Sequence, residues 1–388
     1  MDRRSLLRTA VVAGSTAALG GSLWRTAAVA APAQPGAGPY GPLSAPDSNG
    51  IRLPKDFTSR VIARTGQKVG STGYTWHPAP DGGACFSAED GGWIYVSNSE
   101  VAPGGGAGAV RFDARGGITG AHRILDGTRL NCAGGKTPWN TWLSCEETDR
   151  GAVFETDPWG SKAAQRRPAM GLFKHEAAAV DPDRKVVYLT EDESDGCLYR
   201  FVPSTWGDLS AGRLEVLTMG SGTSGPVSWA KVPDPAAGGT RTRHQVAAAK
   251  HFDGGEGCHY ADGTCWFTTK GDNRVWQLNC AANTIELAYD DDLVRQGEDA
   301  PLSGVDNITG SASGDLFVAE DGGNMEICLI TPDDVVAPFL RVEGHGESEI
   351  TGPAFSPDGK RLYFSSQRGA DGSSSDGVTY EVAGPFRG

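Results

Sequence analysis

The residues with the clearest potential for metal chemistry lie in the segment KTPWNTWLSCEET, residues 136–148. Its Trp-Leu-Ser run is typical of a β-strand and leads directly into a thiol, Cys145, and two carboxylates, Glu146 and Glu147. Three potential metal ligands therefore lie together at the end of one strand. Carboxylate oxygens suit calcium, whereas a thiolate favours a softer ion such as iron or zinc.

Acidic residues recur at comparable places along the chain. Glu191 and Glu320 lie at the ends of strand-like runs, at the position that Cys145 occupies in its run. Other acidic residues, each beside a small residue, lie at the start of the strand that precedes such a run. Carboxylates that converge raise one another's pKa by several units unless cations lie among them. The pattern therefore predicts a metal centre. The predicted ligands are Cys145, Glu146, Glu176, Glu191, Glu256, Asp306, Glu320 and Glu349.

Histidine is nearly absent from these repeated positions, which disfavours a histidine-based zinc hydrolase. His175 precedes Glu176, but side chains alternate along a strand, so we expect His175 to face away from the metal centre and to be structural.

Internal repeats indicate how these residues are positioned. Five further segments resemble the 136–148 run: 91–100, 185–194, 264–273, 314–323 and 360–369. Aligning all six places one aromatic residue of each in a column, with spacings of 47, 46, 78, 51 and 46: Tyr95, Trp142, Tyr188, Trp266, Phe317 and Tyr363. Periods of this length with short apolar runs predict an all-β fold, a six-bladed β-propeller, with an insertion around 204–250.

The ends of the folded region carry one further strand each, in SRVIAR (residues 59–64) and GVTYEVAG (residues 377–384). We expect both strands to complete one blade and close the ring, because closure removes an exposed sheet edge. Residues 51–388 are therefore predicted to form a single domain.

The N-terminal region is predicted to lie outside that domain. Residues 1–30 combine adjacent Arg3 and Arg4 with a short apolar core and an Ala-Val-Ala cleavage site, as in a twin-arginine signal; an ordinary secretory signal is the alternative. The apolar core is too short and too weakly hydrophobic for a spanning helix. Residues 31–50, rich in Pro, Gly and Ala, are predicted to be a flexible leader. We therefore expect export through the twin-arginine machinery to the periplasm or the extracellular space.

The net charge of −13 argues against nucleic-acid binding, which requires basic patches. It fits either a solvated acidic surface or carboxylates that hold cations. Eight cysteines in an exported chain are compatible with disulfides, and Cys258 and Cys265 flank one hairpin as a candidate pair. We expect a monomer.

Five ordered motifs across residues 75–368 resemble the PhoX-type alkaline phosphatases: WNTWLSCEE, FKHEAAAVDP with VYLTEDESDGCLYRFVP, TKGDNRVW, DNI with LFVAEDGG, and ITGPAFSPDGKRLYFSSQ. The resemblance implies a six-bladed propeller, a twin-arginine signal, and ferric (Fe³⁺) and calcium (Ca²⁺) ions that hydrolyse phosphate monoesters and nucleotides. It matches Cys145 to the family's iron-ligating cysteine. It also matches Glu176, Glu256, Asp306 and Glu320 to acidic positions that hold iron or calcium.

One departure bears on activity. Where the family usually has Arg-Pro-Glu, this chain has Gly254-Gly255-Glu256, so the arginine implied to bind substrate phosphate is missing. Lys270 is our candidate catalytic residue in its place, with Arg368 as a second, and a solvated surface charge is the alternative for both. Two other functions stay open: a calcium-dependent propeller hydrolase of lactones or phosphotriesters, and a non-catalytic propeller that binds a partner and uses metals for stability.

Overall fold

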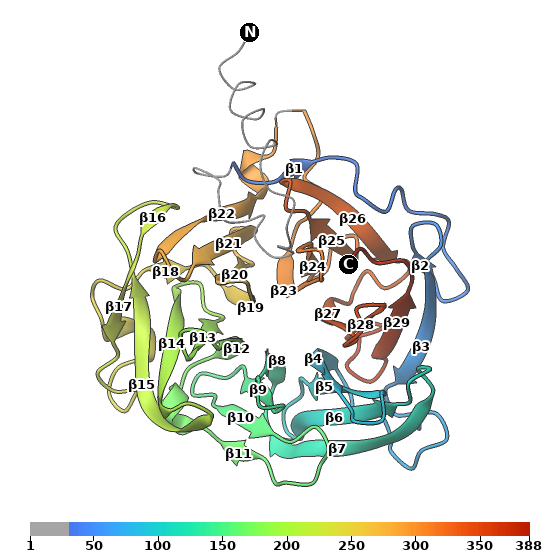
Figure 1. Cartoon of the computed structure of the whole chain (residues 1–388), viewed down its shortest axis with the longest axis horizontal. Coiled ribbons are helices and arrows are strands. Elements are labelled where there is room, and N and C mark those ends of the chain that lie inside the picture. The colour runs from blue at the N-terminus through green and yellow to red at the C-terminus, as the bar shows by residue number, and fades with distance from the viewer. Residues whose placement is uncertain (1–30, 296) are drawn as a thin grey trace.

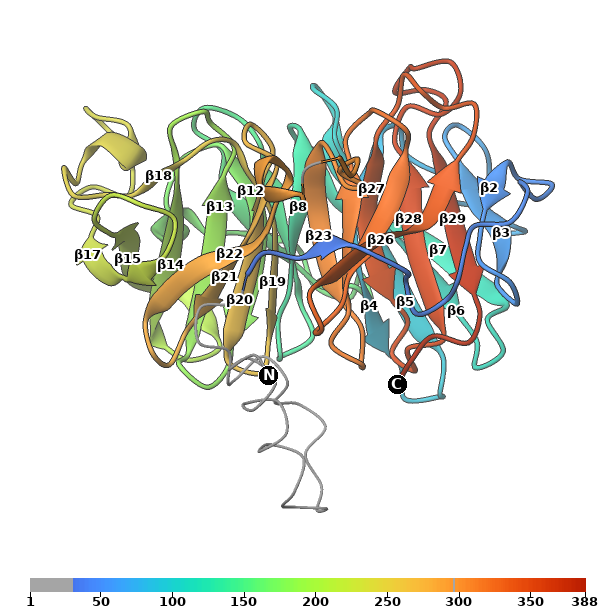
Figure 2. The ribbon, with the colours of Figure 1, turned by 90° about the horizontal axis from the view of Figure 1, so that it is seen from above.

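The computed structural model describes residues 31–295 and 297–388 and forms a six-bladed β-propeller, as predicted (Figure 1). No α-helix occurs in these residues; their helical turns are the short 3-10 helices η2 (Pro168–Met170), η3 (Thr242–His244) and η4 (Asp291–Leu293). The first strand of each blade lies nearest the axis (Figure 1), and the strands run between the two faces of the ring (Figure 2). The signal predicted for residues 1–30 lies outside the described residues.

The six sheets follow one another in chain order. Blade 1 contains β4 (Pro80–Ser87), β5 (Trp93–Ser99), β6 (Gly105–Phe112) and β7 (Ile118–Thr128), and blade 2 contains β8 (Asn131–Lys136), β9 (Trp142–Glu146), β10 (Val153–Thr156) and β11 (Gln165–Arg166). Blade 3 contains β12 (His175–Asp181), β13 (Val186–Glu191), β14 (Gly196–Thr205), β15 (Asp208–Thr218) and β17 (Ser228–Lys231), with β18 (His251–Phe252) paired to β14.

Blade 4 contains β19 (Gly255–Ala261), β20 (Thr264–Thr269), β21 (Arg274–Asn279), β22 (Thr284–Asp290) and β16 (Gly225–Pro226). Blade 5 contains β23 (Val305–Gly310), β24 (Leu316–Glu320), β25 (Glu326–Ile330) and β26 (Val335–Val342), with β1 (Gln34–Pro35) and β2 (Ile51–Arg52) added to β26. Blade 6 contains β27 (Ile350–Phe355), β28 (Arg361–Ser366), β29 (Val378–Ala383) and β3 (Thr58–Arg64).

Ring closure occurs in blade 6, where β29 near the end of the chain pairs antiparallel with β3 near the start of the described chain. The prediction of closure by terminal strands is therefore confirmed. The predicted insertion supplies the outer strands β15 and β17 of blade 3, the edge strand β16 of blade 4, and η3.

The hydrophobic core is divided into six clusters, one between each pair of neighbouring blades. The aromatic column of the repeats supplies a buried side chain from the second strand of every blade. Tyr95 of blade 1, for example, stacks on Tyr363 of blade 6 with ring centroids 4.9 Å apart. Burial of such large rings between blades holds the ring together, because each aromatic side chain removes a large apolar area from water.

The structure corrects the expectation of a flexible leader at residues 31–50. β1 pairs in parallel with β26, and Ala33 is fully buried. The Tyr40 ring packs edge-on against Phe57 and Phe339, with centroids 5.2 and 5.5 Å away. Composition favours disorder in this segment, but tertiary contacts with the outer strand of blade 5 override it. The segment covers the edge of that blade, which would otherwise be open for pairing.

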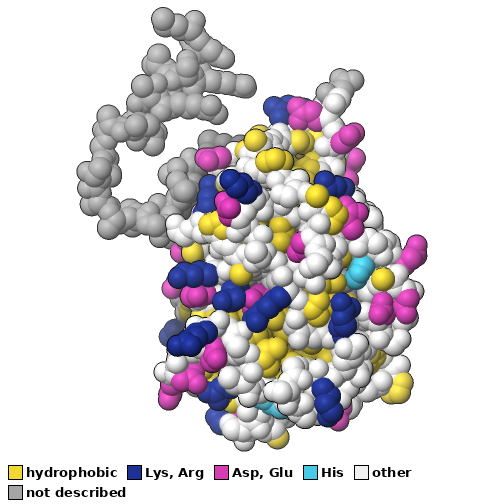
Figure 3. Space-filling model, turned by 90° about the vertical axis from the view of Figure 1, so that its right-hand side faces the viewer, with side chains coloured by type: hydrophobic (Ala, Val, Ile, Leu, Met, Phe, Trp, Pro, Cys, Tyr) yellow, Lys and Arg dark blue, Asp and Glu magenta, His cyan; other side chains and the backbone are white. Residues whose placement is uncertain are grey.

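The outer surface over blades 5 and 6 carries basic and acidic side chains interspersed with apolar ones (Figure 3). Arg60 and Arg361 on this side both pair with the buried Glu381, at 2.7 and 2.6 Å.

Candidate metal centre

The first strand of every blade is irregular at the same place. In each blade one extra residue interrupts the pairing of the first and second strands, one or two residues after they first pair. Such a β-bulge re-aims a side chain that regular alternation would place elsewhere. In each blade, we take the residue at which the first strand begins to pair with the second strand, and then the next residue in the chain. These six next residues form what we call the inner ring: Asp81, Cys132, Glu176, Glu256, Asp306 and Thr351.

The second strands contribute a further set of residues at the same end of the propeller. In each blade, one residue of the second strand pairs with the start of the first strand, and the residue directly after it in the chain is polar. We call these six polar residues the rim ring: Glu100, Glu147, Asp192, Lys270, Asp321 and Gln367. Because paired strands are antiparallel, the start of the first strand and the end of the second meet at one mouth of the channel.

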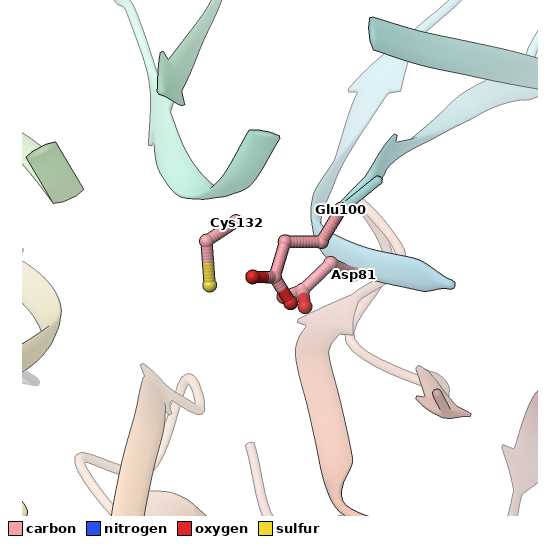
Figure 4. A group of neighbouring side chains, drawn as sticks. All are labelled: Asp81, Glu100 and Cys132. Atoms are coloured by element: carbon pink, nitrogen blue, oxygen red, sulfur yellow. The ribbon is translucent and has the colours of Figure 1, made fainter. Parts of the chain in front are cut away.

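The potential ligand atoms of the two rings lie close together. Three groups have ligand atoms mutually within 4.8 Å: Asp81 with Glu100 and Cys132, Cys132 with Glu147 and Glu176, and Glu176 with Glu256 and Asp306. Figure 4 shows the first group, with both carboxylates directed toward the thiol. Since neighbouring groups share Cys132 and Glu176, one continuous arc of ligands runs from blade 1 to blade 5.

Burial and mutual repulsion make this arc costly to ionise. Burial, reinforced by neighbouring carboxylates, raises the pKa of Asp81 and Glu176 well above the usual range. Burial also raises the pKa of Asp306 to about 7 and, with Glu100, that of Glu147 to about 8. Such a cluster is neutralised either by protons or by cations.

The donor set fits metal ions. The Cys132 thiol donates to Glu176 Oε1 at 3.2 Å, and the buried Glu176 Oε2 has no hydrogen-bond partner among the described residues. An unpartnered buried carboxylate oxygen is costly unless a cation occupies its free side. The combination of many oxygens with one sulfur suits calcium together with a softer ion such as iron.

Three basic side chains reach the mouth, each about one-third exposed. Lys174 Nζ lies 2.8 Å from Glu147 and 2.6 Å from Asp192. Lys270 and Arg368 both approach Asp321. Lys270 Nζ lies 3.3 Å from Asp321 and 2.9 Å from Glu256.

Arg368 completes this set of basic side chains. It lies 3.5 Å from Asp321 and 2.8 Å from Glu349. Burial raises the pKa of Glu349, and so do Asp306, Asp321 and Asp81, which places this carboxylate beside the arc. The structure thus brings the predicted residues Glu176, Glu256, Asp306, Glu349 and Lys270 to one mouth.

Cys145 requires a correction. It lies on the same face of β9 as Leu143, and both pack in the hydrophobic cluster between blades 2 and 3 with Val153 and Phe173. Strand alternation therefore turns this thiol away from the channel. The cysteine among the carboxylates is Cys132, which the sequence analysis missed.

Glu146, Glu191 and Glu320 also lie outside the arc, and here too the structure corrects the prediction. Each accepts a hydrogen bond from the backbone N–H six residues later, at 3.0–3.2 Å, where the third strand of its blade begins. Glu191 also accepts from Tyr199 and Arg243. Each of these three glutamates thus holds a loop in place, and the residue directly after it belongs to the rim ring.

Cys132 could have been found from a different alignment. Asp81, Cys132, Glu176 and Glu256 are each followed by two small or thin residues: Gly-Gly, Ala-Gly, Ala-Ala and Gly-Cys. The close approach of the strands requires them, because a Cβ on Gly82 would lie 2.5 Å from Ala133 Cα. An acid or thiol followed by two such residues therefore marks four of the six inner-ring positions.

His175 and Gly254 complete the comparison with the sequence analysis. His175 is buried against Phe173, and its Nε2 lies 3.0 Å from the carbonyl oxygen of Gly171, as expected for a structural residue. Gly254 has a φ of 71°, a left-handed conformation that favours glycine. A Cβ there would lie 3.3 Å from Asp192 Oδ1, so a side chain at this position would start beside the rim ring.

Comparison with known proteins gives a family and a fold. The family model described as alkaline phosphatase PhoX matches residues 95–156 and 149–369. No curated protein sequence matches this chain. Among solved structures, the chain is similar to Pseudomonas fluorescens PhoX in complex with vanadate, a transition state analogue, with a TM-score of 0.74 and 18% identity over 88% of this chain and 97% of that chain.

A gluconolactonase from Xanthomonas campestris is also similar, with a TM-score of 0.52 and 11% identity over 90% of this chain and 99% of that chain. At these identities, both structural matches show the propeller fold alone.

Proposed function

Because this chain belongs to the alkaline phosphatase PhoX family, we propose that it is an exported phosphatase that hydrolyses phosphate monoesters at a mixed iron and calcium centre. The observation that carries the proposal is the arc of ligands. Five blades each deliver one carboxylate or thiol from the same bulge to one mouth of the channel. A cluster this acidic and this buried suits cations better than an empty cavity.

The ligands divide by chemistry. Cys132, with the neighbouring Glu147 and Glu176, would hold iron, and the oxygen-only group of Glu176, Glu256 and Asp306 would hold calcium. When bound, such cations neutralise the charge of a phosphate ester and stabilise the charge that develops during its hydrolysis.

The side chains of this protein supply binding and orientation. Lys174, Lys270 and Arg368 place three positive charges around the mouth, where they can bind phosphate oxygens and fix the ester in one orientation. Lys270 stays protonated: although its burial opposes the charge, Glu256 and Asp306 raise its pKa. Together these residues supply the positive charge that the missing family arginine would otherwise provide.

No side-chain nucleophile is required in this proposal. Burial, with Asp81 and Glu176, raises the pKa of the Cys132 thiol well above its usual range, which disfavours a free thiolate. We therefore assign Cys132 the role of metal ligand.

The proposed location is the periplasm or the extracellular space, reached by the twin-arginine route, on the basis of Arg3 and Arg4. In the described part of the chain, no helix is long and apolar enough to cross a membrane.

Metal analysis combined with one assay tests the proposal. Protein prepared with iron and calcium available should contain both metals and release phosphate from p-nitrophenyl phosphate in a calcium-dependent way. Folded protein with neither metal would contradict the proposal. Calcium without iron, and no phosphate release, would instead favour a propeller hydrolase of lactones or phosphotriesters. Both metals without hydrolysis of any phosphate ester would favour a binding protein.

Two alanine variants form a matched pair, because each removes one buried thiol. Cys132→Ala should lose iron and activity together. Cys145→Ala should keep both, at a modest cost in stability from the cavity that it leaves in the hydrophobic cluster. Iron loss in Cys145→Ala alone would reverse the assignment of the iron ligand.

A further inference from the structure

A cavity lies between blades 2 and 3. It has a volume of about 210 Å³ and is lined by the loop after β9, by residues 172–173 and 191, and by residues 237–243 of the insertion. We call it the insertion pocket. It is smaller than a typical whole small-molecule site of roughly 300–1,000 Å³, which suits one part of a larger ligand.

Three of the segments that line the insertion pocket are neighbours in sequence of rim-ring residues or of Lys174. Asp149 in its wall lies two residues after Glu147, and Glu191 directly precedes Asp192. Leu172 and Phe173, also in its wall, precede Lys174, whose amino group bridges Glu147 and Asp192. A phosphate ester bound at the mouth can therefore extend its leaving group past Lys174 into this pocket.

The wall of the insertion pocket is rich in arginine: it contains Arg150, Arg241 and Arg243. Carboxylates of the wall and of the adjoining loop pair with Arg241 and Arg243. An arginine that a ligand can reach favours an anionic group, because its guanidinium can donate two parallel hydrogen bonds.

The three arginines are held differently. Arg243 is 8% exposed and pairs with Glu191 at 3.0 Å, so it is fixed within the wall. Arg150 donates to the carbonyl oxygens of Ala236 and Ala237 at 2.7 and 2.5 Å, which ties the insertion to the loop after β9.

Arg241 is the arginine best placed to bind a ligand. Its side chain is 50% exposed, and its nearest carboxylates, those of Asp149 and Glu193, are both 3.4 Å away. Exposed ion pairs of this kind contribute little to stability. The guanidinium of Arg241 can therefore exchange these contacts for a ligand anion at low cost.

We propose that the insertion pocket is a leaving-group subsite that selects phosphate monoesters carrying a second anionic group, a carboxylate or another phosphate, with Arg241 as the contact residue. This inference rests on the proposed phosphatase function. It assigns the insertion the role of setting substrate choice, whereas the two rings perform the chemistry.

A matched substrate pair tests the proposal. 3-Phosphoglycerate carries a carboxylate where glycerol 3-phosphate carries a neutral hydroxymethyl group. The metal-loaded wild-type protein should prefer 3-phosphoglycerate by about tenfold in kcat/KM, and Arg241→Gln should abolish the preference mainly through KM. Arg213→Gln is the control, because Arg213 is also 50% exposed but pairs with Glu215 on the outer strand β15.

Binding of two phosphonate analogues, in which a methylene group replaces the ester oxygen, gives a readout that does not depend on turnover. Titration calorimetry should show tighter binding of the analogue with a carboxylate, and loss of the difference in Arg241→Gln alone. No difference in the wild-type protein, or equal effects of the two arginine variants, would overturn the subsite. Selective binding without hydrolysis of either ester would uphold the subsite and overturn the phosphatase function.

Discussion

Removal of the metal ions should make the protein less stable as the pH rises from 5 to 7. In the ion-free fold, burial raises the pKa of Glu147 from an ordinary 4.5 to about 8 and that of Asp306 from 3.8 to about 7. Over this pH range, both groups are protonated in the native state and ionised in the unfolded chain. The native state therefore binds more protons, so the free energy of unfolding falls as the pH increases.

The magnitude follows from proton linkage. Each retained proton lowers the free energy of unfolding by about 1.4 kcal/mol per pH unit, so two groups over two units account for roughly 5 kcal/mol. With an unfolding entropy of about 2.1 cal/mol/K per residue, this corresponds to a melting temperature roughly 6 °C lower at pH 7 than at pH 5. Water entering the opened mouth would reduce the effect, whereas Asp81 and Glu176, whose pKa burial also raises well above the usual range, would add to it.

Thermal melts followed by circular dichroism, at constant ionic strength and with a chelator present, measure this slope directly. Added calcium and iron should abolish the fall, because cations replace the protons. Glu147→Gln removes one titrating group and should reduce the slope in ion-free protein by about 1.4 kcal/mol per pH unit. Ion-free protein that is equally stable at pH 5 and pH 7, or more stable at pH 7, would refute the view that the carboxylates of the rings are too crowded to ionise.

Three other perturbations have defined outcomes. Lys270→Met should lower kcat/KM for phosphate esters by about a hundredfold, because a charged hydrogen bond to the phosphate is lost; an unchanged value would leave Lys270 as a structural partner of Glu256. Gly254→Arg should lower the melting temperature by a few degrees, because its φ of 71° strains any other residue, whereas a gain in activity would show that the missing cation is limiting. Deletion of residues 31–50 should lower the melting temperature and promote association through the uncovered edge of β26, which size-exclusion chromatography would detect; a truncated protein as stable as the full chain would contradict the packing of this segment.

The overall fold could be predicted because repetition is visible in the sequence. The aromatic column marks the second strand of every blade, and the 78-residue interval marks the insertion. The segment 31–50 could not be predicted in the same way, because its order depends on Tyr40 meeting rings far away in the chain, including Phe339. Local composition carries no information about such contacts.

The candidate site was predicted in part for a related reason. Glu176, Glu256 and Asp306 were identified because an acid recurs at the start of a strand beside small residues. An alignment on the ends of the second strands points to Cys145 and passes over Cys132, which lies near the start of a first strand. The bulge in each first strand breaks regular alternation, and a one-residue irregularity of this kind leaves only a faint trace in the sequence.

Closure of the sixth blade by β3 and β29 also has a consequence for biosynthesis. A nascent chain still lacking β29 leaves β3 without its antiparallel partner, so blade 6 stays incomplete until translation has nearly finished. Chains that terminate before β29 therefore lack the closed ring that encloses the arc of ligands.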